Sequence, residues 1–503
     1  MKKWLRLAAI PVSLGLLAAA CSTSDDDDSA SSQAPAAATA AASTTTEGGA
    51  TTTKGGATTT EGGATTTKSG GSTTTTGKSA ATSTTSGAST TLPATPGPGS
   101  AGSVTVFGVE DSENEAGAEQ DALTEFGQAN GINITYVGRR DFEQQINTQV
   151  LGGNPPDIAL FPQPGKLAQF ARDGDLLPVP EDVVKAVSAD WAPSYMAFSQ
   201  VDGVQYGVPL KADLKSLVWY VPSVWAEKGY TVPKTLTEFK ALIDQMIAKG
   251  DTPLCVGIES GTATGWPFTD WVEELILREQ GIDYYNKWVA HEVPFNDAPV
   301  VQTFDEVAGP DGMWTKQGAV FAVGGSIAAT PFGDNAETLV QGNCMMHRQA
   351  NFFAASFPDG TEFGDGPGQV STFYFPADEG HPVLVGGLQA GAFRDAPEVW
   401  KVMQYLGSAD YANARQIAQA KRVGGGSSGF LTGNSKADPA NWSALEQGFL
   451  ETLKTADPAA FDGSDQMPAE VGSGAFWTEA TAFVNGDEDA KAATENIEAA
   501  WPS

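Results

Sequence analysis

Short apolar runs alternate with amphipathic segments along the chain from about residue 104 onward. The first three apolar runs have the length of buried strands, and they lie at residues 104–109, 132–137 and 158–161. Apolar residues at helical spacing follow each run, at residues 115–129, 141–151 and 165–172. Strands that alternate with helices in this way predict a parallel sheet with helices on both faces.

The alternation continues beyond residue 200 with longer intervals. Runs typical of strands lie at residues 216–220, 254–258 and 383–393, and helical spacing occupies residues 236–248, 266–280, 397–406 and 411–420. A folded part of about four hundred residues exceeds the usual size of one hydrophobic core, so two α/β lobes are expected. Periodicity alone does not decide whether residues 383–393 rejoin the first sheet.

The stretch GGNPPDIALFPQPG, residues 152–165, ends one predicted strand abruptly. The Asn-Pro-Pro within it cannot continue a helix, because proline lacks an N–H donor and restricts the residue before it. Ligands of open α/β sheets bind beyond the carboxyl ends of the strands, which is where Phe161 and Gln163 are expected. The alternative is a buried turn that contacts no ligand.

The N-terminus has the order of a secretory signal, because a basic start with Lys2, Lys3 and Arg6 precedes the apolar residues 7–20. Three alanines directly before Cys21 resemble a bacterial lipobox, which implies cleavage before Cys21 and lipidation of its sulfur. The alternative is an ordinary signal peptide with an incidental cysteine. Residues 22–102 are rich in Ser, Thr, Gly and Ala, and they are expected to form a disordered tether.

The net charge and the cysteines restrict the partners and the cellular compartment that the protein can have. The net charge of −32, from 29 basic and 61 acidic residues, disfavours nucleic acid and anionic membranes as partners. Contact with the membrane is therefore expected only through the lipid anchor, and the protein is expected to be a monomer. Cys255 and Cys344 form an even pair in an oxidising compartment, so a disulfide is expected, with two free thiols as the alternative.

Several ordered segments resemble the extracellular solute-binding proteins of carbohydrate ABC importers, with the strongest likeness to the α-glucoside-binding branch and to maltose-binding relatives. The segments are RRDFEQQI (139–146), GGNPPDIALFPQPG (152–165), YGVPLKADLKSLVWY (206–220), PLCVGIESGTATGWPFTDWVEELIL (253–277), GNCMMHRQANF (342–352) and FDGSDQMPAEVGSGAFW (461–477).

This resemblance implies a two-lobed, periplasmic-binding-protein-like (type II) fold with hinge strands and a cleft between the lobes. It implies a non-enzymatic protein that closes on a neutral sugar, needs no cofactor and delivers the sugar to permease subunits. The first lobe is expected to comprise residues 103–212 and about 374–425. The second lobe is expected to comprise residues 213–373 and about 426–503.

A neutral sugar presents C–H faces and hydroxyls, so its site needs flat rings and strong hydrogen-bonding groups. The candidate rings are Phe161, Trp266, Phe268, Phe352 and Trp477, of which Trp477 matches the stacking tryptophan of the maltose-binding relatives. The candidate polar groups are Asp111, Arg140, Asp141, Gln163, Asp213, Asp270, Gln349 and Asp465, with Glu110 as a further acceptor. Two alternatives stay open. The first is that either Phe268 or Trp271, which share a helix face, belongs to the core. The second is that Asp465 caps a helix instead of binding sugar.

Other functions fit less well. Abundant carboxylates suit a secreted glycosidase, but no local signature pairs them. The three histidines have no zinc-ligand spacing, and there is no P-loop. A site for a glycerol phosphate ester stays open because Arg139, Arg140 and Lys211 could converge on a phosphate. A cell-wall adhesin on a threonine-rich stalk would not need the expected hinge around Asp213.

Overall fold

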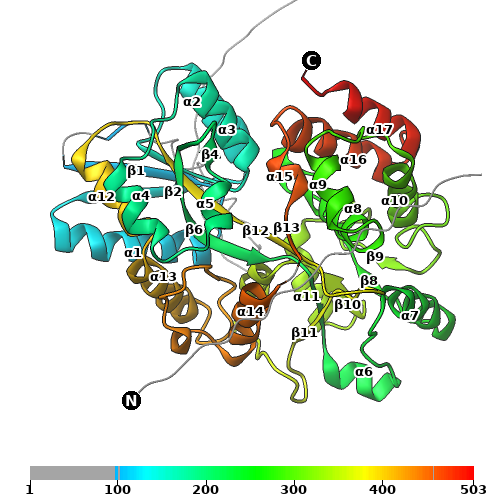
Figure 1. Ribbon diagram of the computed structural model, residues 1–503. Helices are drawn as coiled ribbons and strands as arrows, with labels where there is room; N and C mark the ends of the chain where they lie inside the picture. The colour runs from blue at the N-terminus through cyan, green and yellow to red at the C-terminus, as the bar shows by residue number, and fades with distance from the viewer. Residues whose placement is uncertain (1–96, 100–101, 457, 503) are drawn as a thin grey trace, which may run out of the picture. The chain divides into compact units, whose positions relative to one another are not determined.

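A computed structural model describes residues 97–99, 102–456 and 458–502. The expected signal sequence, Cys21 and residues 22–96 of the expected tether lie outside the described residues. In the described part, strands assemble into two main sheets, each flanked by helices, as Figure 1 shows. The predicted two-lobed α/β architecture is therefore confirmed.

The first sheet has the strand order β13-β12-β3-β1-β2, and β6 also pairs with β12. Its strands are β1 (Ser103–Gly108), β2 (Asn133–Gly138), β3 (Ile158–Phe161), β6 (Gly207–Leu214), β12 (Val383–Ala392) and β13 (Ala459–Phe461). The helices that pack with it are α1 (Glu113–Asn130), α2 (Phe142–Leu151), α3 (Pro164–Asp173), α4 (Glu181–Ser188), α5 (Pro193–Ala197), α12 (Pro397–Leu406) and α13 (Ala409–Arg422). Strands β1, β2 and β3 run parallel, as the alternation of apolar and amphipathic segments predicts.

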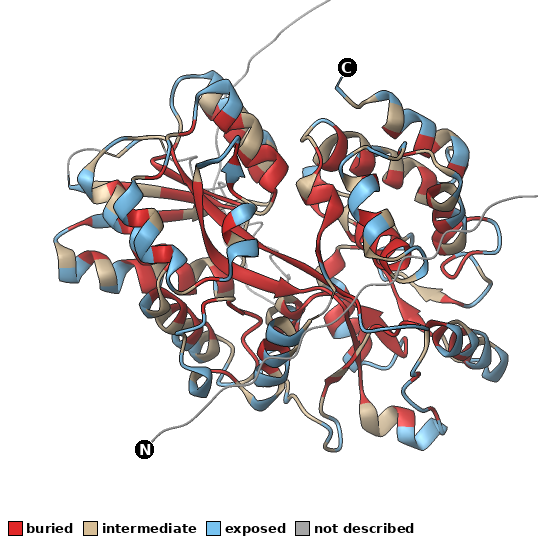
Figure 2. Cartoon of the chain, in the orientation of Figure 1, coloured by how far each residue is buried: buried red, intermediate tan, exposed pale blue. Residues whose placement is uncertain are grey.

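Strand β3 shows why a short apolar run becomes a strand buried on both faces. Ile158 and Leu160 point into one hydrophobic cluster, and Ala159 and Phe161 point into another, to which α2 contributes Phe142 and α3 contributes Phe170. All four residues of the strand have no exposed surface. Figure 2 shows the same pattern over the sheet, with buried strands between helices that are exposed on their outer faces.

The second sheet has the order β11-β7-β10-β8-β9. Its strands are β7 (Leu217–Tyr220), β8 (Leu254–Cys255), β9 (Val320–Phe321), β10 (Met346–Arg348) and β11 (Ser371–Tyr374). The helices of this lobe are α6 (Pro222–Lys228), α7 (Leu236–Lys249), α8 (Trp266–Glu279), α9 (Ile282–Val289), α10 (Ala298–Ala308), α11 (Asn335–Val340), α15 (Gly463–Gln466), α16 (Trp477–Asn485) and α17 (Ala490–Ala499). Strand β8 is shorter than the predicted 254–258, because the backbone leaves the sheet at Gly257 to lie close against Thr330.

The chain passes between the sheets where β6 ends and β7 begins, and again between β11 and β12. Strand β12 thus rejoins the first sheet. Strand β13, which follows α14 (Ala444–Thr455), pairs with β12 before the chain enters α15. This short segment lies in the first sheet, whereas the expected division assigns everything after about residue 425 to the second lobe.

The two lobes touch at the N-terminus of α3. A Cβ atom on Gly165 would lie only 1.9 Å from the carbonyl oxygen of Met467, at the end of α15. Only a residue without a side chain permits such a close approach of two backbones. The glycine that ends the stretch 152–165 therefore holds α3 against the second lobe.

The second lobe contains a disulfide between Cys255 and Cys344, whose Cα atoms are 5.4 Å apart. The expected pairing of these two cysteines is present. No helix of the described residues is long and apolar enough to cross a membrane.

Candidate functional site

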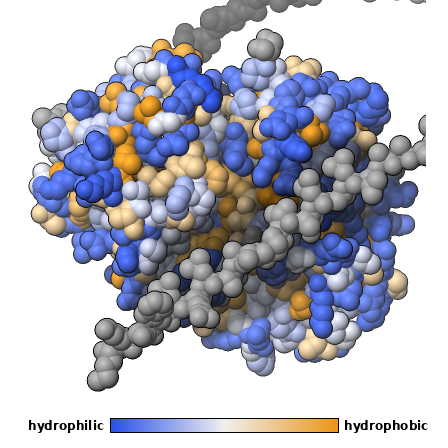
Figure 3. Space-filling model, viewed as in Figure 1, coloured by the Kyte–Doolittle hydropathy of each residue, from blue (hydrophilic) through white to orange (hydrophobic). Residues whose placement is uncertain are grey.

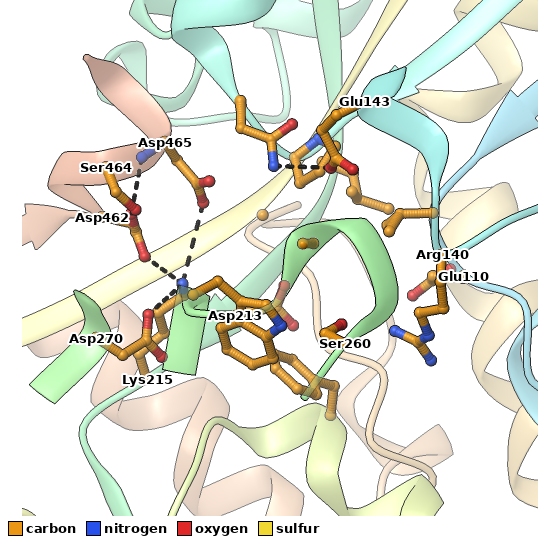
Figure 4. A pocket seen from close by; sticks show the side chains of 18 of the residues that line it. Glu110, Arg140, Glu143, Asp213, Lys215, Ser260, Asp270, Asp462, Ser464 and Asp465 are labelled. Carbon is orange, nitrogen blue, oxygen red and sulfur yellow. Dashed lines mark hydrogen bonds and ion pairs between the residues drawn. The ribbon is translucent and has the colours of Figure 1, made fainter. Parts of the chain in front are cut away.

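A cavity of about 130 Å³, here called the inner pocket, lies between the two lobes. Figure 4 shows its polar side chains converging from both sides, and Figure 3 shows apolar surface in the hollow between the lobes, while the outer faces are mostly polar. Its walls are formed by Val109, Glu110, Glu115, Arg140, Glu143, Pro162, Gln163, Lys211, Asp213, Lys215, Ser260, Ala263, Trp266, Asp270, Phe332, Phe352, Gly387, Leu388, Asp462, Ser464, Asp465 and Trp477.

The first-lobe wall is built at the carboxyl ends of the parallel strands. Glu110 follows β1, Arg140 follows β2, and Gln163 follows β3. Parallel strands bring these ends to one edge of the sheet, which is where ligands bind in open α/β folds. The Gln163 amide donates a hydrogen bond of 3.1 Å to the Glu143 carboxylate, so this edge presents joined polar groups.

Lys211 on β6 is held by two carboxylates. Its Nζ lies 2.8 Å from Glu110 and 3.3 Å from Asp213, and the guanidinium of Arg415 lies 2.8 Å from the other Glu110 oxygen. Burial alone would raise the pKa of Glu110, but Lys211 and Arg415 outweigh it and lower the pKa to about 2. Burial raises the pKa of Asp213, although Lys211 opposes this effect.

Lys215 lies where the chain crosses from β6 to β7, and it is held by carboxylates from two distant segments. Its Nζ lies 3.0 Å from Asp270 on α8 and 4.0 Å from Asp465 on α15, and it also pairs with Asp462 (Figure 4). Burial would lower the pKa of Lys215, but Asp270 and Asp462 outweigh it and raise the pKa well above its usual range. Burial and the neighbouring carboxylate Asp462 raise the pKa of Asp465.

Arg140 is the third cation of the inner pocket. Its Nε lies 2.9 Å from Asp111 and one guanidinium nitrogen lies 3.8 Å from Glu115, while its Cζ lies 5.3 Å from the ring centre of Phe332. Every cation that lines this pocket in the described part of the chain is therefore already paired with a carboxylate. The lining carboxylates outnumber the cations, and they are Glu110, Glu115, Glu143, Asp213, Asp270, Asp462 and Asp465.

Aromatic rings form the second-lobe wall. Trp266 lies 5.0 Å from Phe332 and 6.0 Å from Phe352 between ring centres, which makes one continuous aromatic surface. Trp477 stands apart from these rings at the start of α16. Its indole nitrogen is buried and has no hydrogen-bond partner.

The structure brings eight of the thirteen predicted ligand-contacting residues to the inner pocket. They are Arg140, Gln163, Asp213, Trp266, Asp270, Phe352, Asp465 and Trp477. Asp465 does not cap α15. The capping side chain is that of Asp462, which accepts a hydrogen bond from the Asp465 N–H. Asp465 is thus available to the pocket.

Two predicted rings lie in the hydrophobic core and not on the wall of the inner pocket. Phe161 is fully buried, with its ring centre 5.7 Å from that of Phe142, because the alternation along β3 turns it toward α2 and α3. Phe268 is fully buried against Phe304 at 5.1 Å. Trp271 shares its helix face and is also in the core.

Three predicted polar residues also lie outside the wall of the inner pocket. Asp111 binds Arg140 and thereby orients a residue that does line the pocket. Asp141 accepts from Arg139 at 2.7 Å, and Gln349 uses its amide oxygen to accept from the Ala350 N–H at 2.8 Å. Each carboxylate or amide is occupied by a structural partner.

Sequence reasoning missed several pocket residues, of which Lys215 and Asp462 matter most. Lys211, Asp213 and Lys215 are spaced by two residues, and a strand places such residues on one face. Lys211 and Asp213 lie in β6 and Lys215 follows it directly, and three charged residues at this spacing in a mostly apolar stretch were the signal for a charged wall. Asp462 lies 247 residues from Lys215 and carried no local signal.

A family model described as "Bacterial extracellular solute-binding protein" matches residues 110–413. The chain is 37% identical over 432 residues to the osmoprotective compounds-binding protein GgtB of Synechocystis sp., which covers 82% of this chain and 96% of that protein. It is 35% identical over 421 residues to the alpha-glucosides-binding periplasmic protein AglE of Rhizobium meliloti, which covers 80% of this chain and 87% of that protein.

Solved structures agree on the fold. The bacterial solute receptor AcbH matches with a TM-score of 0.67 at 20% identity, and the match covers 79% of this chain and 97% of that chain.

Proposed function

Because the chain belongs to the bacterial extracellular solute-binding protein family, a non-enzymatic component of transporters, we propose that its inner pocket captures a neutral α-glucoside for a carbohydrate ABC importer. Small osmoprotective glycosides belong to the same chemical class and are included. The expectations of this family and of a non-enzymatic role are confirmed. The ligand and the residues that hold it are the proposal.

The observation that carries the proposal is the charge state of the inner pocket. Lys211, Lys215 and Arg140 are each held by carboxylates, so none of them is free to bind a phosphate or carboxylate ligand. The excess carboxylates would repel an anion, but they can accept hydrogen bonds from hydroxyl groups. This arrangement favours a neutral polyhydroxylated ligand over a glycerol phosphate ester.

The aromatic surface supplies the complementary half of sugar recognition. Trp477 would stack on one sugar face, and Trp266 with Phe352 would contact another. Asp213, Asp270 and Asp465 would accept hydroxyl hydrogens, and Arg140 and Gln163 would donate. Each of these residues lines the same cavity.

Delivery needs a partner and a location. The family function implies a membrane permease, which the loaded protein would meet outside the cytoplasm. Lipidation at Cys21 would hold the protein at the outer face of the cytoplasmic membrane, and residues 22–102 would let the lobes reach the permease. The two lobes would be divided along the chain as expected, except that β13 belongs to the first lobe.

Calorimetric titration of the full chain with maltose, trehalose, sucrose, maltotriose and glycerol 3-phosphate tests the proposal. One neutral sugar should bind and glycerol 3-phosphate should not, with no release of reducing ends. Trp477→Ala should weaken that binding by about 2 kcal/mol, as expected of an aromatic anchor. Thr478→Ala, one residue on and exposed, is the matched control. Binding of the phosphate ester alone would contradict the proposal.

A further inference from the structure

Helix α8 packs in the hydrophobic core of the second lobe, yet it buries four ionisable side chains. Asp270, Glu273 and Glu274 have no exposed surface, and the side chain of Arg278 is also fully buried. Of these four, only Asp270 lines the inner pocket. Burying a charged group is costly unless partners compensate, so the other three charges need an explanation that is not ligand contact.

Asp270 begins a line of alternating charges that leads away from the inner pocket. It lies 3.0 Å from the Nζ of Lys215 and 2.6 Å from one guanidinium nitrogen of Arg348. A second guanidinium nitrogen of Arg348 lies 2.9 Å from Glu274, and Glu274 also pairs with Arg278. Each buried charge therefore has an opposite charge beside it, and the line joins the pocket wall to the far part of α8 through continuous contacts.

In the described part of the chain, three segments pass between the lobes and are here called the crossovers. They are Lys215–Ser216 between β6 and β7, residues 375–382 between β11 and β12, and Asp462 between β13 and α15. In the first crossover, the Ser216 hydroxyl donates to Glu274 at 3.1 Å and accepts the Leu384 N–H at 2.8 Å. This hydroxyl therefore joins α8 to β12, the strand that follows the second crossover.

Arg278 fastens the second crossover at both of its ends. Its guanidinium donates to the carbonyl oxygens of Phe375, at 2.7 Å, and Pro376, at 3.0 Å, where the crossover begins. It also donates to the carbonyl oxygen of Pro382 at 3.3 Å, where the crossover ends. A guanidinium can do this because it presents several donors in a rigid planar fork.

Glu273 fastens the third crossover. Its carboxylate accepts the N–H groups of Gly463, at 2.7 Å, and Ser464, at 2.9 Å, directly after Asp462. Asp462 itself pairs with Lys215 of the first crossover (Figure 4). Side chains of one helix thus bond all three crossovers, and the crossovers also bond one another.

We infer that α8 holds the three crossovers as one unit, and that Arg278, Glu273 and Glu274 are positioning residues that control sugar affinity without touching the sugar. Fixed crossovers restrict the relative orientations of the two lobes, so the two walls of the inner pocket face each other in the binding arrangement for more of the time. The apparent affinity falls in proportion when that arrangement is less populated. This inference rests on the proposed function and adds residues that act on it from outside the pocket.

Calorimetric titration of the full chain with maltose, trehalose, sucrose and maltotriose tests the role of Arg278. Arg278→Met releases the second crossover, while Glu274 keeps Arg348 as its cation. The sugar that the wild-type chain binds should bind roughly 3- to 30-fold more weakly, the scale on which residues of a coupled network change affinity. Arg394→Met is the matched control and should keep the wild-type affinity. Arg394 also bonds a carboxylate, that of Asp157, and a backbone carbonyl, but at the end of β3 opposite the pocket.

A milder pair of variants keeps the test decisive if Arg278→Met does not fold. Ser216→Ala removes only the hydroxyl that joins α8 to β12, and it should also weaken sugar binding. Ser199→Ala is its control and should not, because Ser199 lies in the first lobe away from the crossovers. Ser199 is equally buried, and its hydroxyl likewise makes two hydrogen bonds, to Gln389 at 3.0 Å and from Gln205 at 2.8 Å.

Hydrogen exchange without sugar distinguishes a joint action of α8 from local loosening. In Arg278→Met, exchange should become faster at all three crossovers, including the N–H groups of Gly463 and Ser464, which bond to Glu273 and not to Arg278. Arg394→Met should leave exchange at the crossovers unchanged. Faster exchange confined to residues 375–382 would overturn the inference, because α8 would then not hold the crossovers as one unit.

The titrations separate this inference from the proposed function. If a sugar binds to the wild-type chain and binds equally well to Arg278→Met and Ser216→Ala, the positioning role is overturned and the proposed function stands. If no sugar binds to the wild-type chain, the proposed function is overturned, and the positioning role is overturned with it.

Discussion

Lys211 and Lys215 lie four residues apart at the end of one strand, and both are almost fully buried, yet they are held in different ways. Lys211 is paired within the first lobe by Glu110 and Asp213, and Arg415 supports Glu110 from behind. Lys215 is paired by residues that come from α8 and α15. The first cluster shapes one wall of the pocket, whereas the second joins the hinge to the other lobe.

The difference shows that two equally buried lysines can contribute unequally to stability, because their carboxylate partners differ in whether another cation remains. If Lys211 is removed, Glu110 keeps the guanidinium of Arg415. If Lys215 is removed, Asp462 and Asp465 lose the only cation within 4.0 Å of either in the described part of the chain. The predictions below test this contrast, from the largest expected effect to the smallest.

Lys215→Met should be the most damaging change. It leaves buried carboxylates without their cation, and loss of one partner of a buried ion pair lowers the free energy of unfolding by about 3–5 kcal/mol. Lys211→Met, the matched control four residues earlier, should lose clearly less. Guanidinium denaturation of both variants measures the two values. Equal losses of unfolding free energy in the two variants would contradict the proposed difference between the clusters.

Acid should act on the first cluster through Glu110. Its pKa is about 2 in the folded chain, below the ordinary value of 4.5, so its stabilising contribution is present above about pH 5. That contribution, on the order of 3 kcal/mol, is lost as the pH falls toward 2. Between pH 5 and 2 the wild-type chain should therefore lose more stability than Glu110→Gln. Parallel curves for the two chains would refute this assignment, and Asp111→Asn, one residue on, serves as the control.

Asp213→Asn should act mainly on ligand affinity. Asp213 lines the inner pocket, and a hydrogen bond to a charged group contributes about 1.5–3 kcal/mol, so sugar binding should weaken by that amount. Calorimetric titration measures the change. Asp182→Asn, at an exposed residue of α4, leaves the pocket wall intact and should alter the affinity far less. An unchanged affinity in Asp213→Asn would exclude this carboxylate from the site.

Arg140→Ala should have the smallest effect on stability. The Arg140 side chain is 37% exposed and its partner Asp111 is 34% exposed, and such pairs contribute about 0–1 kcal/mol. Thermal unfolding should therefore shift only slightly. A large loss would mean that the contact between Arg140 and Phe332 stabilises the two lobes together.

The first sheet could be predicted from the sequence because its first three strands and helices follow one another along the chain. The same order places Arg140 and Gln163 at the ligand-facing edge. Phe161 does not line the inner pocket, although it lies only two residues before Gln163. It still belongs to the alternation of β3, which points it into the core, whereas Gln163 lies beyond the strand.

The second-lobe wall could not be predicted from periodicity. Asp270 is separated from Asp465 and Trp477 by a long stretch of chain, and only the likeness to a known family brought the three residues together. Neither the periodicity nor the family resemblance led to the prediction of Lys215 and Asp462. Their pairing depends on how β13 and the hinge approach each other, which no local pattern records.

The close contact at Gly165 has a consequence for the rates of ligand exchange. Since a Cβ atom there would lie 1.9 Å from the Met467 carbonyl oxygen, even alanine must push α3 and α15 apart. A Gly165→Ala chain would then keep the mouth of the cleft wider, so bound sugar should escape faster while arriving at a similar rate. The absence of one methyl group would thus set the lifetime of the complex, and with it the time that a captured ligand has to reach the permease.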